Sequence, residues 1–507
     1  MRLPLIFSRR LSLTYGLAAL ASAGLAHGET SKLFGKDGEL WDRAGRLTDF
    51  SYAGYHSGEA PLPRPPVKAN VKDFGAKGDG VTDDTEAFRQ AIEKTDAGAI
   101  LIPAGKYVLK DILEIRKPNI VLRGEGPDKT TLFFPLGLEQ VRPSASATTT
   151  GLPTSAYSWS GGFLWIKGEQ KGAWLGNVAV PAARGTHVIE LDRAPKVSVG
   201  DKIEITQEDA GDGSLSQHLY QGQSDSTSAI KFTRTRFVSR VEKIDGTKIT
   251  LERALRTEVN PQWKAVVKTF APSVSEVGIE DLCFEFANVP YRGHFKEDGF
   301  NPIAVTGAAD CWVRHIRILN ADSGPFLNGS SFVTLDGLVF ESSRQPTSGG
   351  ETGHHGVTLG EDNLLTNFDF RCKFIHDISV EGTAGSVASK GRGVDLCFDH
   401  HKRFPHANLF TEIDLGAGTR PYHCGGGDNL GRNSAAWTTF WNLRSKAPIS
   451  RPPTSFAPDL INIVGVFSKE APILDPKGVW FEPIDPASLE PANLYEAQKA
   501  LRLKARK

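Results

Sequence analysis

The sequence predicts an all-β chain built as a solenoid of short stacked coils. Short apolar runs recur along the chain and are separated by turns rich in Gly and Pro, which suits the tight corners of such a fold. The composition agrees, because 52 Gly, 30 Pro and a single Met indicate many turns and few long helices. An elongated repeat fold can use all 507 residues as one unit.

Residues 1–26 have the pattern of an export signal. Arg9 and Arg10 precede an apolar run that ends in small residues, and Ser8-Arg9-Arg10 is similar to a twin-arginine signal. The run is too short to span a bilayer, and no later segment is long and apolar enough to do so. We therefore expect a periplasmic or secreted protein without a membrane span.

The segment 70–88 carries the most specific pattern, NVKDFGAKGDGVTDDTEAF. Asp83 or Asp84 can cap a helix with an apolar stripe over residues 87–92, and this helix would cover the open first rung of a stacked sheet. The segment resembles the N-terminal signature of the pectate-lyase-like superfamily. The resemblance implies a right-handed parallel β-helix with an N-terminal capping helix.

Between residues 140 and 272 the apolar alternation runs over longer spans, and Asp245-Gly246 is a hairpin signal. This pattern predicts an inserted antiparallel β subdomain. The full expected division is an export signal at 1–26, an extended leader at 27–66, N-terminal coils with the capping helix at 67–139, the β insertion at 140–272, the main coils at 273–470, and a tail with a short helix at 471–507.

Charge and cysteine content limit the classes of partner. Lys plus Arg and Asp plus Glu both number 59, so no global field recruits nucleic acid or a membrane surface, and an anionic ligand needs a local basic cluster. Five cysteines cannot all pair within the chain and none lies in a Cys-x-x-Cys clip, which argues against a zinc knuckle. We expect buried thiols, with one disulfide between neighbouring strands left open. No coiled-coil segment is visible, and a monomer is expected.

Candidate functional residues concentrate in the stretch from Lys390 to Gly427. Its first part alternates apolar and polar residues as a strand does, with Asp395 and Asp399 on the polar face. His400 and His401 follow where this strand is expected to end. Groups that titrate near neutral pH at the end of a strand suit acid–base chemistry.

A second histidine pair, in Gly353-His-His-Gly356, lies about two coils earlier. Neighbouring rungs of a stacked solenoid are about 4.8 Å apart, so His354 or His355 can reach the same groove. The candidate set therefore draws on both segments. We expect catalytic roles for His400, His401, His355 and Lys390, and substrate-binding roles for Arg392, Arg403, Arg420, His423, Asp395 and Asp399.

The resemblance implies a protein that acts on or binds uronic-acid polysaccharides, and the residues must decide the reaction. β-Elimination needs a cation beside the uronate carboxyl and a base for the neighbouring proton. The arginines suit the first task and the histidines the second, which predicts a secreted polysaccharide lyase. Two alternatives stay open: a hydrolase with paired carboxylates on adjacent rungs, such as Asp395 with Asp369 or Asp414, and a non-catalytic carbohydrate-binding solenoid.

Calcium is a further element to weigh. The resemblance implies it, since many β-helix lyases use calcium to neutralise a carboxylate. Asp395, Asp399 and Asp414 could supply oxygens, but no sequence-local calcium loop is visible. The pattern requires no cofactor, and a calcium ion stays open.

Overall fold

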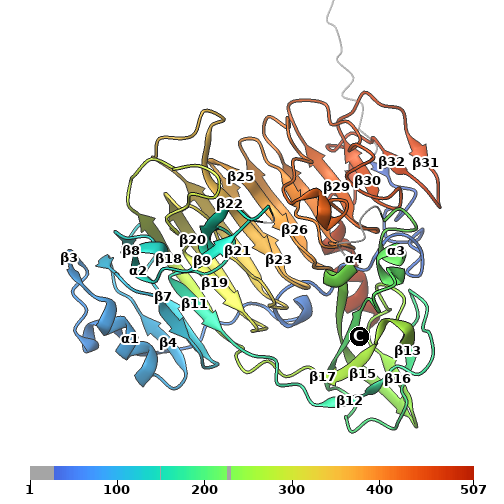
Figure 1. The fold of residues 1–507 in the computed structure, drawn as a ribbon, viewed down its shortest axis with the longest axis horizontal. Coiled ribbons are helices and arrows are strands. Elements are labelled where there is room, and N and C mark those ends of the chain that lie inside the picture. The colour runs from blue at the N-terminus through green and yellow to red at the C-terminus, as the bar shows by residue number, and fades with distance from the viewer. Residues whose placement is uncertain (1–27, 149, 225–229, 507) are drawn as a thin grey trace, which may run out of the picture.

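The computed structural model is a parallel β-helix whose coils stack along the long axis of the molecule (Figure 1). It describes residues 28–148, 150–224 and 230–506, so the expected export signal at 1–26 lies outside the described part. The predicted fold class is confirmed: a right-handed parallel β-helix with an N-terminal helix and an antiparallel insertion. None of the described helices combines the length and the apolar character that a membrane crossing requires.

Two faces of the β-helix form one continuous parallel ladder. In the first coils each face has its own short strands, and from β18 onward most single strands bend and serve both faces. The first-coil strands are β2 (Val67–Asn70), β4 (Gly98–Leu101) and β7 (Ile120–Arg123) on one face, and β3 (Asp79–Asp83), β5 (Gly105–Val108) and β8 (Thr130–Phe134) on the other. The later strands are β18 (Gly278–Phe286), β20 (Trp312–Leu319), β21 (Thr334–Glu341), β23 (Leu364–Thr366), β24 (Asp369–Phe370), β26 (Val387–Gly393), β28 (Leu409–Asp414), β29 (Thr439–Arg444), β30 (Asn462–Val466) and β32 (Trp480–Glu482). The short strand β31 (Ile473–Leu474) pairs with β32 in the antiparallel direction.

One residue in each of these later coils makes the bend between the two faces. It adopts the left-handed conformation, with φ between 52° and 71°, and the strand pairing stacks these residues along the axis. The row consists of Asp281, His315, Gly337, Asn367, Lys390, Glu412, Asn442 and Gly465. Most of these residues are not glycine, although the left-handed conformation is unfavourable for residues with a Cβ atom. The bend therefore places Lys390 at an outer corner of the coils.

The third face carries the strands β6 (Leu113–Ile115), β11 (Leu164–Lys167), β19 (Ile303–Thr306), β22 (Glu351–Leu359), β25 (Lys373–Val380) and β27 (Phe398–His400). Bridges through Phe326 join β19 to β22, so this face is also continuous. Val357, Ile378 and Phe398 are paired in register and belong to the buried core. Alternation along the strands turns their neighbours Thr358, Ser379 and Asp399 to the opposite side.

Helices and loops cover the remaining surfaces. Helix α1 (Thr85–Lys94) lies at the N-terminal end of the coils (Figure 1), and its buried residues join the main core. The leader, with Phe34 and Phe50, packs together with helix α4 (Leu494–Ala505) on the outside of the later coils. The other helices are α2 (Leu138–Val141), α3 (Ser214–Leu219), η1 (Tyr55–Gly58), η2 (Val71–Phe74), η3 (Ala156–Ser158), η4 (Ile230–Phe232), η5 (Pro261–Trp263) and η6 (Asp428–Leu430).

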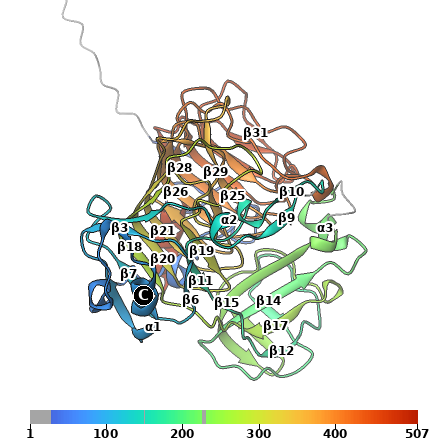
Figure 2. The same cartoon turned by 60° about the vertical axis from the view of Figure 1, so that its left-hand side comes forward.

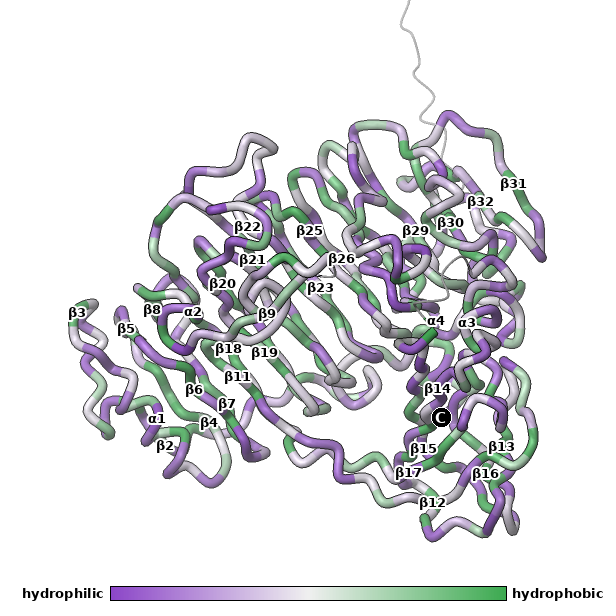
Figure 3. The backbone as a smooth tube through the Cα atoms, in the orientation of Figure 1, coloured by the Kyte–Doolittle hydropathy of each residue, from purple (hydrophilic) through white to green (hydrophobic). Residues whose placement is uncertain are grey.

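A six-stranded antiparallel sheet projects from one side of the coils (Figure 2). Its strands lie within the expected 140–272 insertion and are β12 (Trp174–Asn177), β13 (Val188–Glu190), β14 (Lys202–Glu208), β15 (Arg234–Asp245), β16 (Lys248–Leu251) and β17 (Val266–Thr269). Two small pairs complete the strands: β9 (Ala145–Ala147) with β10 (Pro153–Ser155), and β1 (Glu29–Thr30) with β33 (Leu489–Glu490). Figure 3 shows hydrophobic residues along the coil strands and hydrophilic ones in many connecting loops.

The five cysteines are free thiols, and three of them are buried. The disulfide that the sequence left open is therefore not formed in this structure. Burial raises the pKa of the Cys283, Cys311 and Cys372 thiols to about 12. Thiols of this kind are poor nucleophiles, which is consistent with structural roles.

Replacing Lys390 tests the left-handed corner. Both Lys390→Val and Lys390→Gly lose the contact of Nζ with Glu496, which is 3.3 Å long. Only Val must also adopt the unfavourable conformation, so we expect the Val variant to be less stable than the Gly variant by about 1–2 kcal/mol in urea unfolding.

The matched control is Lys106, which lies in β5 and contacts Glu285 at 2.8 Å. In an extended strand the order should reverse, with Lys106→Val more stable than Lys106→Gly. Equal stabilities of the two Lys390 variants would contradict the role given to the corner.

Candidate functional site

Six of the thirteen histidines gather on the third face of the β-helix. His354 and His355 come from β22, His376 from β25 and His401 from the residue after β27. Two loops add His294 and His423. The ring centroids of neighbouring members lie between 4.1 and 6.0 Å apart.

Strand register explains why residues so far apart in the chain meet. His355 and His376 are direct partners in the parallel ladder, and so are Ser379 and Asp399. His401 follows Asp399 by two positions, which returns its side chain to the same side of the strand. The cluster is therefore a product of stacking and not of a local sequence motif.

Asp399 is the hydrogen-bonding centre of the cluster. Its carboxylate is fully buried and accepts hydrogen bonds from Ser379 Oγ at 2.9 Å and from the backbone N–H of Gly425 at 2.8 Å. His401 Nδ1 lies 2.7 Å from Oδ2 of the same carboxylate. Because Ser379 gives its proton to Asp399, it accepts from His355 Nδ1 at 3.1 Å. A chain of hydrogen bonds thus links His355, Ser379, Asp399 and His401.

Attraction between Asp399 and His401 sets the protonation states of these two residues. Burial opposes charge on Asp399, but the charged His401 and its hydrogen bond to the carboxylate outweigh it and hold the pKa of the carboxyl well below its ordinary value. Burial likewise lowers the pKa of His401, yet attraction to Asp399 and their hydrogen bond raise it to about 9. At neutral pH an imidazolium therefore lies beside a carboxylate.

The other buried imidazoles are neutral. Burial, reinforced for His355 by neighbouring histidines, lowers the pKa values of His355 and His376 well below the ordinary value. Burial also lowers the pKa of His294 to about 4. His294 and His423 are nevertheless exposed as residues, and the His401 side chain is 23% exposed. These three imidazoles form the accessible rim of the cluster.

A second buried carboxylate, Glu297, contacts the cluster at His354. It accepts hydrogen bonds from Ser158 Oγ at 2.6 Å and from Tyr291 Oη at 2.9 Å, and its Oε1 lies 3.2 Å from His354 Nδ1. Burial opposes its charge, but His354 and the hydrogen bonds lower the pKa of Glu297 to about 2. The cluster therefore holds its imidazoles between two ionised carboxylates.

The structure brings together four of the residues that the sequence suggested: His355, His401, His423 and Asp399. It places His400 elsewhere. The His400 side chain lies in the interior, where its ring packs against Phe410 at 5.3 Å and Phe456 at 5.0 Å. Burial lowers the pKa of His400 to about 4, so it is a neutral core residue in this structure.

The remaining residues for which the sequence suggested a role form ion pairs or stabilise turns. Lys390 and Arg392 lie on β26, away from the third face, where they contact Glu496 and Asp369. Asp395 accepts from the backbone N–H and the hydroxyl of Thr419. The guanidinium of Arg420 binds Asp377 at 2.7 Å and backbone carbonyls beneath the cluster. Arg403 contacts Glu381 at 2.9 Å close to His401.

Sequence reasoning missed three members of the cluster: His294, His376 and Glu297. His376 lies on β25, which pairs directly with β27, so it is one coil away from Asp399, and only this register brings the two residues together. His400 carried a usable signal, because it is two residues from Phe398 and strand alternation puts both on the apolar side.

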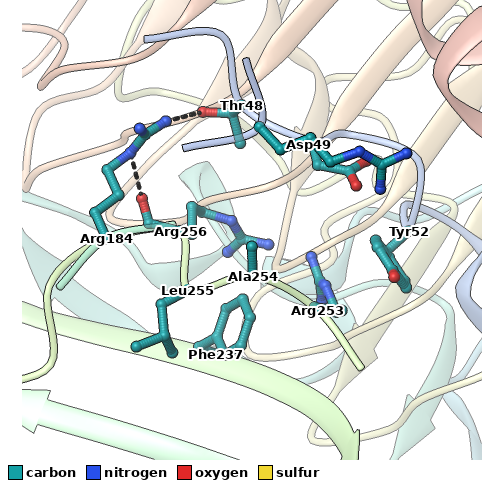
Figure 4. A pocket seen from close by; sticks show the side chains of 10 residues that line it. Thr48, Asp49, Tyr52, Arg184, Phe237, Arg253, Ala254, Leu255 and Arg256 are labelled. Carbon is teal, nitrogen blue, oxygen red and sulfur yellow. Dashed lines mark hydrogen bonds between the residues drawn. The ribbon is translucent and has the colours of Figure 1, made fainter. Parts of the chain in front are cut away.

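A separate pocket lies between the leader and the insertion, as Figure 4 shows. Arg184 donates hydrogen bonds there to Thr48 and to the backbone carbonyl of Arg256, while Arg253 binds Asp362 through two contacts of 2.9 Å. These arginines are engaged in joining parts of the protein. The residues of this pocket therefore have a structural role in joining the leader, the insertion and the coils. The histidine cluster is the stronger candidate for a functional site.

Comparison with known proteins adds a family match in the first coils. Residues 68–141 match the family model described as rhamnogalacturonase A/epimerase, pectate lyase-like. Alginate lyase 7 of Azotobacter vinelandii is 36% identical over 113 residues, which are 20% of this chain and 13% of that protein. Mannuronan C5-epimerase AlgE5 of the same organism is 37% identical over 97 residues, 17% of this chain and 9% of that protein. The matched part thus spans at most 13% of these two relatives.

Two solved structures that match this chain have low sequence identity and TM-scores below 0.5. The tailspike protein gp49 of Pseudomonas phage LKA1 is 13% identical, with 78% of this chain and 67% of that chain covered and a TM-score of 0.46. An exopolygalacturonase of Thermotoga maritima is 11% identical, with coverage of 80% and 72% and a TM-score of 0.34. The strand pairing of the chain itself establishes the fold.

The pairing of His401 with Asp399 predicts a pH dependence of stability. The pKa of His401 is about 9 when folded and near 6.5 when unfolded, so its contribution is complete below pH 6.5 and is lost as pH rises through about 9. Stability should fall by up to about 1.4 kcal/mol per pH unit in this window. Urea unfolding measured across the window reports the slope.

Asp399→Asn removes the negative charge that raises the pKa of His401 and should flatten that slope, whereas the control Asp395→Asn, which changes a turn carboxylate, should keep it. An unchanged slope in Asp399→Asn would contradict the assigned coupling.

Proposed function

We propose that this protein is an enzyme that cleaves a uronic-acid-containing polysaccharide by β-elimination. Its parallel β-helix and the match of residues 68–141 to a pectate lyase-like family model support this proposal. The observation that carries the proposal is the cluster of imidazoles and buried carboxylates on the third face. Two relatives are named for alginate and mannuronan, which supports an acidic polysaccharide as the substrate class.

β-Elimination needs positive charge at the uronate carboxylate. His401 and Arg403 are two residues apart in the chain and both are partly exposed, so we propose that a carboxylate at the rim contacts them together. Asp399 fixes the His401 ring through Nδ1, which leaves the other ring nitrogen to face the ligand. Such fixed orientation is what positions a group for proton transfer or ion pairing.

A base must then remove the proton next to the carboxyl group. His423 is the rim imidazole best suited to this task, because it is exposed and its ring stacks 5.9 Å from that of His376 at an angle of 18°. The electron pair of the broken C–H bond forms the new double bond, and the glycosidic oxygen leaves with a proton. His401 is the group placed to donate that proton or to stabilise the leaving oxygen.

The carboxylates that a hydrolase would need have other tasks in this structure. Asp369 binds Arg371 and Arg392, and Asp414 accepts from the backbone N–H of Gly416. Asp395 holds the turn at Thr419. These contacts favour elimination over hydrolysis by the Asp pairs that the sequence suggested.

Turnover of polyuronides tests the proposal. Purified protein should release products with the ultraviolet absorbance of a double bond conjugated to a carboxylate when it is incubated with alginate, polygalacturonate or related polymers. His401→Ala should lower kcat by about 10²–10⁴-fold, the usual share of a general acid or base.

His315→Asn is the matched control, because His315 is an exposed imidazole that bonds Asp281 at an outer corner remote from the third face. It should leave the rate unchanged. New reducing ends without the absorbance would replace elimination by hydrolysis, and no product from any polymer would favour a binding solenoid.

A further inference from the structure

Three histidines of the cluster are placed to hold a metal ion. One potential ligand nitrogen from each of His294, His354 and His376 lies within 4.8 Å of the others. They come from a loop and from two adjacent coils. We propose that these three side chains form a binding site for a transition-metal ion, with Zn²⁺ as the best-fitting ion.

Unpartnered nitrogens give independent support. The His354 and His376 side chains are 1% and 2% exposed, and among the described residues neither ring has a hydrogen-bond partner for either nitrogen. A buried polar atom without a partner costs about 1–3 kcal/mol, and native proteins contain few of them. Two such rings side by side, facing a third imidazole, indicate a ligand that satisfies all three.

The surroundings match those of metal-binding histidines. His354 Nδ1 lies 3.2 Å from Glu297, and His376 Nδ1 lies 3.5 Å from Asp399, although neither contact has hydrogen-bond geometry. A histidine ligand commonly has one nitrogen on the ion and the other facing a carboxylate, which orients the ring. Both rings stand in this relation to a buried carboxylate, and both carboxylates are held by further hydrogen bonds.

The donor set selects the kind of ion. Imidazole nitrogens suit Zn²⁺ and related transition metals, whereas Ca²⁺ takes oxygen ligands, so the calcium that the sequence left open does not fit this site. Three histidines and an open fourth position are typical of zinc sites that also bind water or substrate. With Zn–N bonds of about 2.0–2.1 Å the nitrogens must approach to about 3.3 Å. The exposed, loop-borne His294 can make much of that movement.

The neighbouring group of His376, Asp399 and His401 is a weaker candidate for the ion. Its potential ligand atoms are also within 4.8 Å of one another. Asp399 and His401 already bond each other at 2.7 Å, and Asp399 accepts from Ser379 and Gly425. This hydrogen-bonded network explains the closeness of its members without a metal.

Zinc binding can be measured without any polysaccharide, so its result does not depend on whether the protein catalyses the proposed reaction. Untagged full-length protein is treated with a chelator, dialysed and titrated with ZnCl₂ by calorimetry. We expect one tight equivalent, a rise in Tm on binding, and no comparable heat with CaCl₂. Cobalt(II) should give the visible spectrum of a tetrahedral site.

His294→Ala is the principal variant, since this exposed loop residue can be removed without opening the core. It should weaken zinc binding by at least the 10–100-fold that loss of an outer-shell partner costs. Glu297→Gln is the second variant and should weaken binding by about 10–100-fold while keeping the shape of the site.

His423→Ala and His315→Asn are controls, which remove a rim imidazole of the cluster outside the proposed ligand set and an imidazole far from the cluster. Unchanged zinc affinity in His294→Ala, an equal loss in either control, or no tight equivalent in the wild type would each overturn the metal site.

Discussion

The register of the parallel strands is the constraint on which the rest of the structure depends. Strand pairing places each residue of these strands beside its partner in the next coil, so Thr358, Ser379 and Asp399 form one row although 21 and 20 positions separate them in the chain. A slip by one residue would turn this row into the core and expose the apolar one. Burial of Val357, Ile378 and Phe398 in the core therefore sets the strand register, and with it the position of the polar row on the other side of the strands.

The histidine cluster contains buried polar groups that are unfavourable for the stability of the fold. Buried carboxylates at Asp399 and Glu297 and unpartnered rings at His354 and His376 contribute less to stability than apolar residues of similar volume often do. Local features that oppose stability are expected where a protein binds or converts a ligand. The adjacent core of stacked aromatic and aliphatic residues supplies the stability that tolerates them.

Sequence patterns predicted the architecture better than the site. The signature at 70–88 and its helix were predictable because both depend on local turn chemistry. Helix α1 begins at Thr85, directly after Asp84, but the Asp84 side chain accepts hydrogen bonds from the backbone N–H groups of Lys77 and Gly78 and does not cap the helix. The pairing of Asp399 with His401 follows from alternation along one strand. His294 and His376 stand alone in the sequence, and only the stacking of distant coils joins them. Lys390 could not be placed, because lysine gives no sign that it adopts a left-handed corner.

The insertion meets the coils at Asp362, a buried carboxylate in the turn before β23. Arg253 and Arg256 of the insertion both bind it, and the leader donates the N–H of Gly54 to its backbone carbonyl at 2.8 Å. Separating these groups would leave an uncompensated charge in a dry interior, which is strongly unfavourable. A hinge at this point is therefore disfavoured, and we expect the insertion to move with the coils as one rigid body. The insertion then sets a steric limit on how closely long polymers or neighbouring surfaces can approach the coils.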